Sequence, residues 1–157
     1  MKLIQDHWDC SSIAAEVRLQ YINETKPEER KVLDSPEKAA EILWEIFPPD
    51  QIEFKEHFCV LLLNNSKQLL GYGITSIGGK TATIVDVSEI ITIALLGAAN
   101  SIIIAHNHPS GRLTPSAADT NLTTRIRRAL SYMGITMDDH LIVTKHSYYS
   151  FSANREL

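Results

Sequence analysis

Two histidines stand two residues apart in His106-Asn107-His108, directly after the apolar run 102–105, and Asp119 follows eleven residues later. Imidazole nitrogen and carboxylate oxygen are the donors of catalytic zinc sites, in which three protein ligands leave the fourth position to water. Residues two apart in extended chain point to the same side, so both imidazoles can approach one ion. The spacing therefore makes a three-ligand zinc site feasible, and a protein with such a site would be a hydrolase.

The same residues also have ordinary structural interpretations, which the spacing alone leaves open. His106 could be a hydrogen-bonded core histidine, and a His-x-His pair at a strand end is often only a pair of polar residues. Ser116-Ala117-Ala118-Asp119 has the pattern of a capping box, in which Ser is the N-cap and an acid stands three positions later. Spacing makes metal binding feasible without establishing it.

The elements around the motif predict an α/β fold in one domain, with helices packed on a mixed sheet. Apolar runs at 58–63 and 102–105 predict strands buried on both faces, and the second of them delivers His106 at its end. Cap residues predict helices that start near Ser35, Asp86 and Ser116 and stop near residues 48, 97 and 134. The other strands are expected at 13–22, 68–76, 82–85, 141–144 and 148–151.

Composition bounds the class of protein. The chain has 157 residues, 44% of them hydrophobic and 22% charged, which suits one ordinary globular domain. Two cysteines provide no disulfide framework, and Cys59 lies in an apolar run where a buried free thiol is usual. Neither a signal peptide nor a membrane span is evident, so we expect a cytoplasmic protein without membrane contact.

Charge argues against a broad nucleic-acid footprint. The formal net charge is −4, and residues 1–56 alone carry 13 acids against 7 Lys or Arg. Binding to a phosphate backbone requires a basic surface, so direct nucleic-acid binding is disfavoured. Arg125, Arg127 and Arg128 do cluster, but their place on a predicted helix favours a solvated face.

The string His106-Asn107-His108-Pro109-Ser110-Gly111, followed by Thr114-Pro115-Ser116 and Asp119, resembles the signature of the JAMM (MPN-plus, JAB domain) metallopeptidases, in particular their RadC-like branch. The resemblance covers roughly residues 34–152. It implies a JAMM/MPN domain over 34–157, with a cytidine-deaminase-like architecture, and leaves 1–33 as an N-terminal strand and charged linker. Relatives often have an N-terminal helix-hairpin-helix segment, which we do not expect in these acidic residues.

The resemblance also implies a role for each member of the site. One Zn²⁺ per chain would be bound by His106, His108 and Asp119. Glu56, just before the apolar strand, is similar to the family's general base, and Ser116 would donate a hydrogen bond to the oxyanion. Without the resemblance, Glu56 would be an exposed acid at a strand start.

Other titratable residues are weaker candidates. Glu53 is the alternative base, and Glu89 is a poorer one because acids favour the first turn of a helix in any case. His140 resembles a recurrent feature of RadC-like chains and could support the metal ligands from behind, although we prefer the interpretation that it marks a strand end. We expect ordinary polar roles for His7, His57 and His146.

The predicted function is hydrolysis of a peptide, isopeptide or related amide bond by metal-activated water. The alternative is a DNA-repair or mobile-element accessory protein that acts with DNA, a role attached to the RadC-like group by name rather than by mechanism. A metal-free interaction module is a third hypothesis, which the complete ligand set disfavours. The sequence identifies neither the substrate nor the oligomeric state.

Overall fold

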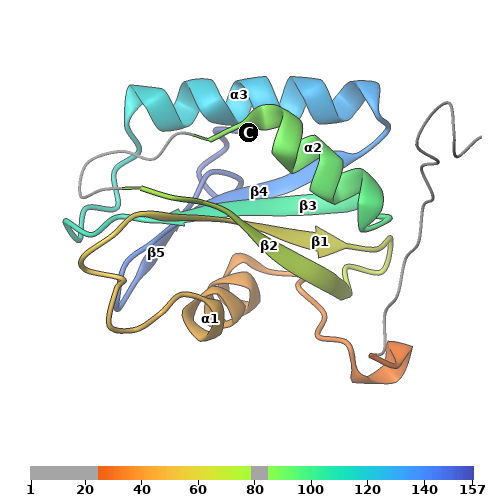
Figure 1. The fold of residues 1–157 in the computed structure, drawn as a ribbon, viewed down its shortest axis with the longest axis horizontal. Helices are drawn as coiled ribbons and strands as arrows, with labels where there is room; N and C mark the ends of the chain where they lie inside the picture. Colours follow the sequence, from red (N-terminus) through yellow and green to blue (C-terminus); the bar gives the residue numbers. More distant parts are fainter. Residues whose placement is uncertain (1–24, 79–84) are drawn as a thin grey trace, which may run out of the picture.

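The computed structural model describes residues 25–78 and 85–157. Within these ranges the chain forms a five-stranded mixed sheet in the order β2-β1-β3-β4-β5. Helices α2 and α3 cover one face of the sheet, and α1 covers the other (Figure 1). The elements are the 3-10 turn η1 (Pro27–Glu29), α1 (Pro36–Ile46), β1 (His57–Leu63), β2 (Leu69–Ile77), α2 (Val87–Leu96), β3 (Ser101–Asn107), α3 (Ala117–Tyr132), β4 (Thr136–Val143) and β5 (Tyr148–Ser150). The predicted α/β fold with a mixed sheet is confirmed.

The helix signals in the sequence act as expected. Ser35 caps α1 by accepting a hydrogen bond from the Lys38 backbone N–H, and α1 stops at Phe47, just before two prolines. Asp86 caps α2 in the same way through the N–H of Ser88. Ser116 caps α3, which ends two residues before Gly134. Local chemistry therefore sets these helix boundaries.

The central strands are buried on both faces, as their apolar runs predict. Every residue of β1 and β3 is buried, and the two strands pair antiparallel. The predicted β1–β2 and β4–β5 pairs are also antiparallel, whereas β3 and β4 run parallel. Alternate side chains of β1 enter two separate cores, and Cys59 lies as a buried free thiol in the core under α1.

Two strand predictions need comment. We expected the fourth strand of the sheet to begin at residue 141, but β4 begins at Thr136. The sequence obscures this start because Asp138 and Asp139 are poor strand residues, and Asp139 is tolerated there because Ser150 Oγ and the Ser152 N–H bind its carboxylate. The expected strand at 13–22 and most of that at 82–85 lie outside the described residues. None of the helices described reaches the length and hydrophobicity that spanning a bilayer requires.

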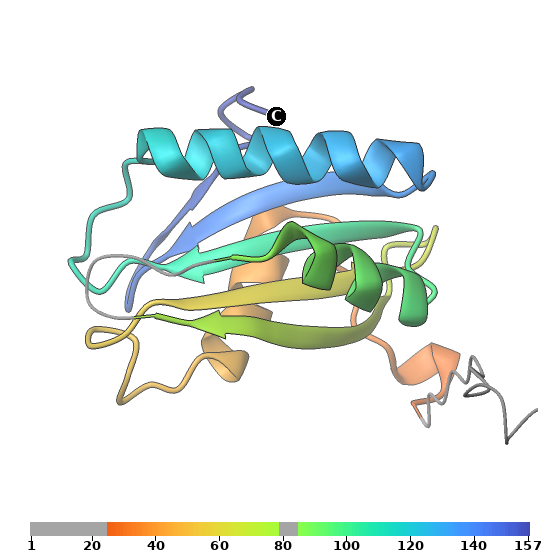
Figure 2. The same ribbon diagram turned by 45° about the horizontal axis from the view of Figure 1, so that its top comes forward.

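The connection between β3 and β4 creates the place for a site. Because these strands are parallel, α3 must cross back over the sheet between them. The C-terminal end of β3, the start of α3 and the start of β1 consequently lie at the same end of the molecule (Figures 1 and 2). Ligands of open α/β sheets bind outside the carboxyl ends of such strands.

Candidate metal centre

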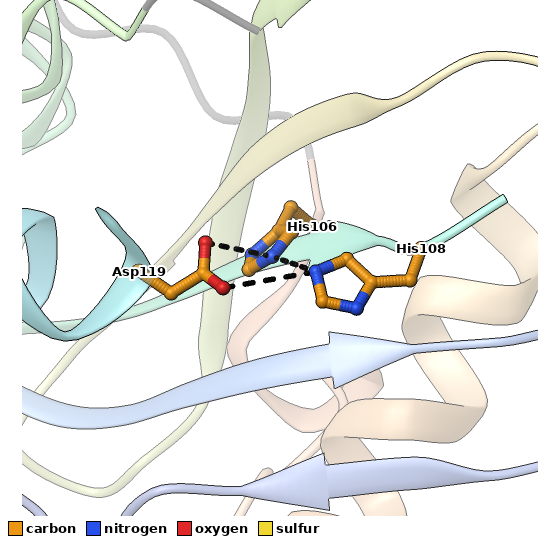
Figure 3. Close-up of side chains that lie close together, drawn as sticks. All are labelled: His106, His108 and Asp119. Atoms are coloured by element: carbon orange, nitrogen blue, oxygen red, sulfur yellow. Dashed lines mark hydrogen bonds and ion pairs between the residues drawn. The ribbon is translucent and has the colours of Figure 1, made fainter. Parts of the chain in front are cut away.

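The side chains of His106, His108 and Asp119 converge at this end of the sheet (Figure 3). One ligand atom from each lies within 4.8 Å of the others. His106 Nε2 is 2.9 Å from His108 Nε2 and 3.3 Å from Asp119 Oδ1, and His108 Nε2 is 3.8 Å from Asp119 Oδ2. Tetrahedral zinc with Zn–N bonds of ~2.0–2.1 Å holds its ligand atoms about 3.3 Å apart. The three residues therefore fit around a single ion of this size.

The loop after β3 sets which ring nitrogen of His108 carries the hydrogen. The Nδ1 atom of His108 is 2.7 Å from the carbonyl oxygen of Arg112. A carbonyl can only accept, so Nδ1 carries the hydrogen and Nε2 of the neutral ring presents a lone pair. The loop closes through a hydrogen bond from the Gly111 N–H to the His108 carbonyl, with Gly111 at φ 75°, a conformation that favours glycine. Gly111 thus helps to hold the loop that orients the His108 ring.

The close approach of His106 and His108 calls for positive charge. Two ring nitrogens 2.9 Å apart repel each other through their lone pairs unless a proton or a metal ion lies between them. Asp119 faces the same point, and although burial opposes its ionisation, the neighbouring His106 ring and the Ser116 groups hold the pKa of its carboxyl well below the usual range. Two nitrogen lone pairs and one carboxylate thus form a donor set suited to a divalent cation.

Asp119 and Ser116 form the capping box as well as contributing to the site. Asp119 Oδ2 accepts hydrogen bonds from the Ser116 N–H and hydroxyl, both at 2.7 Å, and the Asp119 N–H donates to Ser116 Oγ at 3.2 Å. The capping role of Asp119 is therefore compatible with the predicted role of its carboxylate in metal binding. The hydroxyl proton of Ser116 points to Asp119, so its predicted oxyanion role requires this proton to turn away, and that role stays a prediction.

Glu56 lines the cavity that contains the three converging side chains. The cavity has a volume of about 810 Å³. Burial raises the pKa of the Glu56 carboxyl above its ordinary value, although the nearby His106 and His108 oppose this effect. Glu53 instead extends to Lys145, 3.0 Å away, and Glu89 is exposed at the start of α2; neither lines the cavity. Of the three candidate bases, Glu56 alone shares the cavity with the histidines.

Asn107 explains how Glu56 reaches this position, and sequence reasoning assigned it no role. Its side-chain Oδ1 accepts from the His57 N–H, and its Nδ2 donates to the carbonyls of Ile52 and Lys55, all at 2.7 Å. These three groups flank Glu56 in the chain. The buried amide therefore fastens the turn that carries Glu56 to the strand that carries the histidines. Its place between the two histidines of the motif was the available signal.

His140 lies behind His106, in the middle of β4. The expectation that it marks a strand end is wrong, because β4 runs from Thr136 to Val143. His140 is fully buried, its Nε2 is 2.9 Å from His106 Nδ1, and its Nδ1 is 2.6 Å from Thr123 Oγ1. Burial holds the pKa of His140 well below its ordinary value. Sequence reasoning missed Thr123, although its position four residues after Asp119 on a helix places the two on one face.

The other two histidines that the structure describes, His57 and His146, take no part in this cluster. His57 is buried at the start of β1 beside Phe47, on the α1 side of the sheet. His146 is exposed in the turn between β4 and β5, and His7 lies outside the described residues. Arg125, Arg127 and Arg128 are exposed on α3, as expected for a solvated face.

Comparison with known proteins identifies a family and several relatives of this chain. A family model described as RadC-like JAB domain matches residues 33–157. A UPF0758 protein of Listeria monocytogenes is 37% identical over 141 residues, which are 89% of this chain and 62% of that protein. One from Thermosynechococcus vestitus is 38% identical over 146 residues, covering 89% and 55%, and one from Flavobacterium johnsoniae is 44% identical over 96 residues, covering 61% and 42%. The chain thus spans about half the length of these relatives.

Proposed function

Because the chain belongs to the family of RadC-like JAB domains, we propose that it is a zinc-dependent hydrolase of a peptide, isopeptide or related amide bond. The observation that carries this proposal is the convergence of His106, His108 and Asp119 in a cavity that Glu56 also lines. Two imidazoles and one carboxylate are a ligand set of catalytic zinc sites. When bound, the ion would lower the pKa of a water in the site to ~7 and polarise the substrate carbonyl.

The residues of the chain supply proton transfer and positioning. Glu56 has a raised pKa because it is half-buried, so it holds a proton more readily than an exposed glutamate does. It would accept the proton of the attacking water and return it to the leaving amine. Asn107 keeps this carboxylate facing the histidines, since its amide holds both sides of the turn. Position and pKa both suit Glu56 to the role of base.

The cavity suits a segment of chain rather than a small ion alone. Its walls include apolar side chains from several elements, among them Phe58, Val85, Pro115 and Leu122. Among the described residues that line it, Arg112 is the one Lys or Arg. We expect the substrate to place an apolar group on these walls and a carbonyl or carboxylate near the guanidinium.

A substrate screen with a matched pair of variants tests the proposal. Zinc-loaded wild type and Glu56→Gln are incubated with peptide, isopeptide and nucleic-acid libraries, and Glu53→Gln serves as the control acid outside the cavity. Wild type and Glu53→Gln should cleave the same amide, while Glu56→Gln binds zinc and loses cleavage. Full activity of Glu56→Gln would exclude Glu56 as the base, and cleavage confined to nucleic acid would support the DNA-related alternative.

A further inference from the structure

We infer that Thr123 and His140 are positioning residues that fix the tautomer of His106, so that its Nε2 lone pair stays available to the metal ion. The inference rests on the proposed metal site and deepens it, but it does not require that the protein hydrolyse any particular substrate. It follows from three hydrogen bonds in series, one partly buried and two buried, which join Asp119, Thr123, His140 and His106.

The direction of this series is set at its far end. Thr123 Oγ1 is 2.6 Å from the backbone carbonyl of Asp119, and a carbonyl oxygen can only accept. The single hydroxyl proton of Thr123 is therefore used in this bond. Toward His140 Nδ1, also 2.6 Å away, Thr123 must act as the acceptor. The ring hydrogen of His140 consequently lies on Nδ1.

The surroundings of His140 then determine what its other nitrogen does. The ring is fully buried and stacks on Phe151, with centroids 4.6 Å apart and planes 11° apart, and Phe58 packs nearby. A charged imidazolium would lose its hydration among these apolar rings, so the ring is neutral. With the hydrogen on Nδ1, Nε2 of His140 carries a lone pair. It accepts a hydrogen bond from Nδ1–H of His106 at 2.9 Å.

The consequence for His106 matches the state already derived for His108. With its hydrogen on Nδ1, His106 presents the Nε2 lone pair toward His108 and Asp119. His108 reaches the same tautomer through the Arg112 carbonyl. The tautomer of His108 is thus fixed by the Arg112 carbonyl, and that of His106 by the hydrogen bonds through Thr123 and His140, which we call the relay. Partners of this kind orient metal-binding histidines and raise their basicity.

The relay also connects His106, a proposed nitrogen ligand, to Asp119, the proposed oxygen ligand. Asp119 contributes its carboxylate to the site and its backbone carbonyl to Thr123, one helical turn further along α3. A shift of this turn would therefore move Asp119 and release His140 together. The geometry links the start of α3 to the end of β3 through buried side chains, independently of the surface loop between them.

Thr123→Val and Thr123→Ser form the matched pair that tests this inference. Valine keeps the shape and removes the hydroxyl, whereas serine keeps the hydroxyl and removes a methyl group. In the full chain, zinc affinity is measured by competition with a chelator. We expect Thr123→Val to bind zinc about 10- to 100-fold more weakly, and Thr123→Ser to stay near wild type.

Nitrogen NMR of histidine-labelled wild type provides a readout that needs no variant. In the zinc-free chain, the proton between the His106 and His140 rings should be bonded to His106 Nδ1, with a scalar coupling across the hydrogen bond to His140 Nε2. A proton on His140 Nε2 would overturn the inference, as would equal zinc affinity in Thr123→Val and wild type. Loss of affinity in the serine variant as large as in the valine variant would reduce Thr123 to a packing role and overturn it as well. These readouts do not depend on cleavage, so a failed substrate screen would remove the proposed hydrolysis and leave the inference standing.

Discussion

His106 and Asn107 are consecutive buried polar residues of β3, and they face opposite sides of the sheet. His106 faces the side of α3, where its Nδ1 donates to His140 and its Nε2 faces His108. Asn107 faces the side of α1, where its amide binds three backbone groups of the chain between Ile52 and His57. Asn107 satisfies its polar atoms with backbone groups, whereas His106 keeps one ring nitrogen directed at the proposed metal position.

This difference indicates that the two sides of the sheet contribute to the site in different ways. An amide has fixed donors and acceptors, so the Asn107 side behaves as a static clamp that places Glu56. An imidazole can hold its proton on either nitrogen, so the His106 side needs further residues to choose between the two states. Variants on the α3 side should therefore alter metal binding, and variants on the α1 side should alter stability and the position of the base.

The largest effect should come from removing a ligand on the metal side. His108→Ala should bind no stoichiometric zinc, because two ligands remain, while its folding should change little since His108 is only partly buried. Metal analysis of the purified chain measures the first effect and thermal unfolding the second. Asp50→Ala, which removes an exposed acid outside the cavity, is the control. Zinc retained at one per chain in His108→Ala would remove the distinction between the two sides.

The second-largest effect should come from lowering the pH, which should release the metal before it unfolds the chain. Imidazoles must be neutral to bind a metal ion, so zinc should be released as pH falls and the histidines take up protons. Asp119 has a depressed pKa, so what its ionised form contributes is lost only as pH falls below its ordinary value of 3.8. A zinc titration against pH, monitored together with unfolding, should show metal loss before loss of fold. Zinc release only near or below pH 3.8 would assign the effect to Asp119 instead.

Asn107→Asp should act on the clamp with almost unchanged shape. One carboxylate oxygen can still accept from the His57 N–H, but the other faces the carbonyls of Ile52 and Lys55, which can only accept. We expect the free energy of unfolding to fall by about 3 kcal/mol, measured by denaturant titration. Zinc affinity should stay within about threefold of wild type. A large loss of affinity with unchanged stability would show that the sides are not separate.

Ser116→Ala should give the smallest effect, because it lies where the capping box meets the site. Loss of the N-cap hydroxyl should cost about 1 kcal/mol of stability, and Ser116→Thr should restore it. Zinc affinity should fall only modestly, since Asp119 keeps its hydrogen bond from the Ser116 N–H. Denaturant titration and chelator competition on both variants measure these values. Stability unaffected by alanine would show that the box does not support α3.

Sequence patterns were sufficient where the relevant chemistry is local. The caps at Ser35, Asp86 and Ser116 and the doubly buried strands β1 and β3 follow from neighbouring residues. The convergence of the two histidines and Asp119 followed from spacing and from the family resemblance together. These features need little knowledge of distant contacts.

Features that depend on distant contacts could not be predicted in this way. The start of β4 depends on Ser150 and Ser152, which bind Asp139 from beyond the turn. The hydrogen bonds of Asn107, Thr123 and His140 involve partners up to 55 residues away. Their residue types were visible in the sequence, but the sheet order that brings them together was not.

Crystals of the chain grown with zinc, measured at the zinc absorption edge, test the central claim most directly. We predict one anomalous peak per chain, bonded to Nε2 of His106, Nε2 of His108 and a carboxylate oxygen of Asp119, with Glu56 facing the open side. A peak bonded through an Nδ1 atom or located away from these three residues, or no peak after growth in excess zinc, would contradict the account.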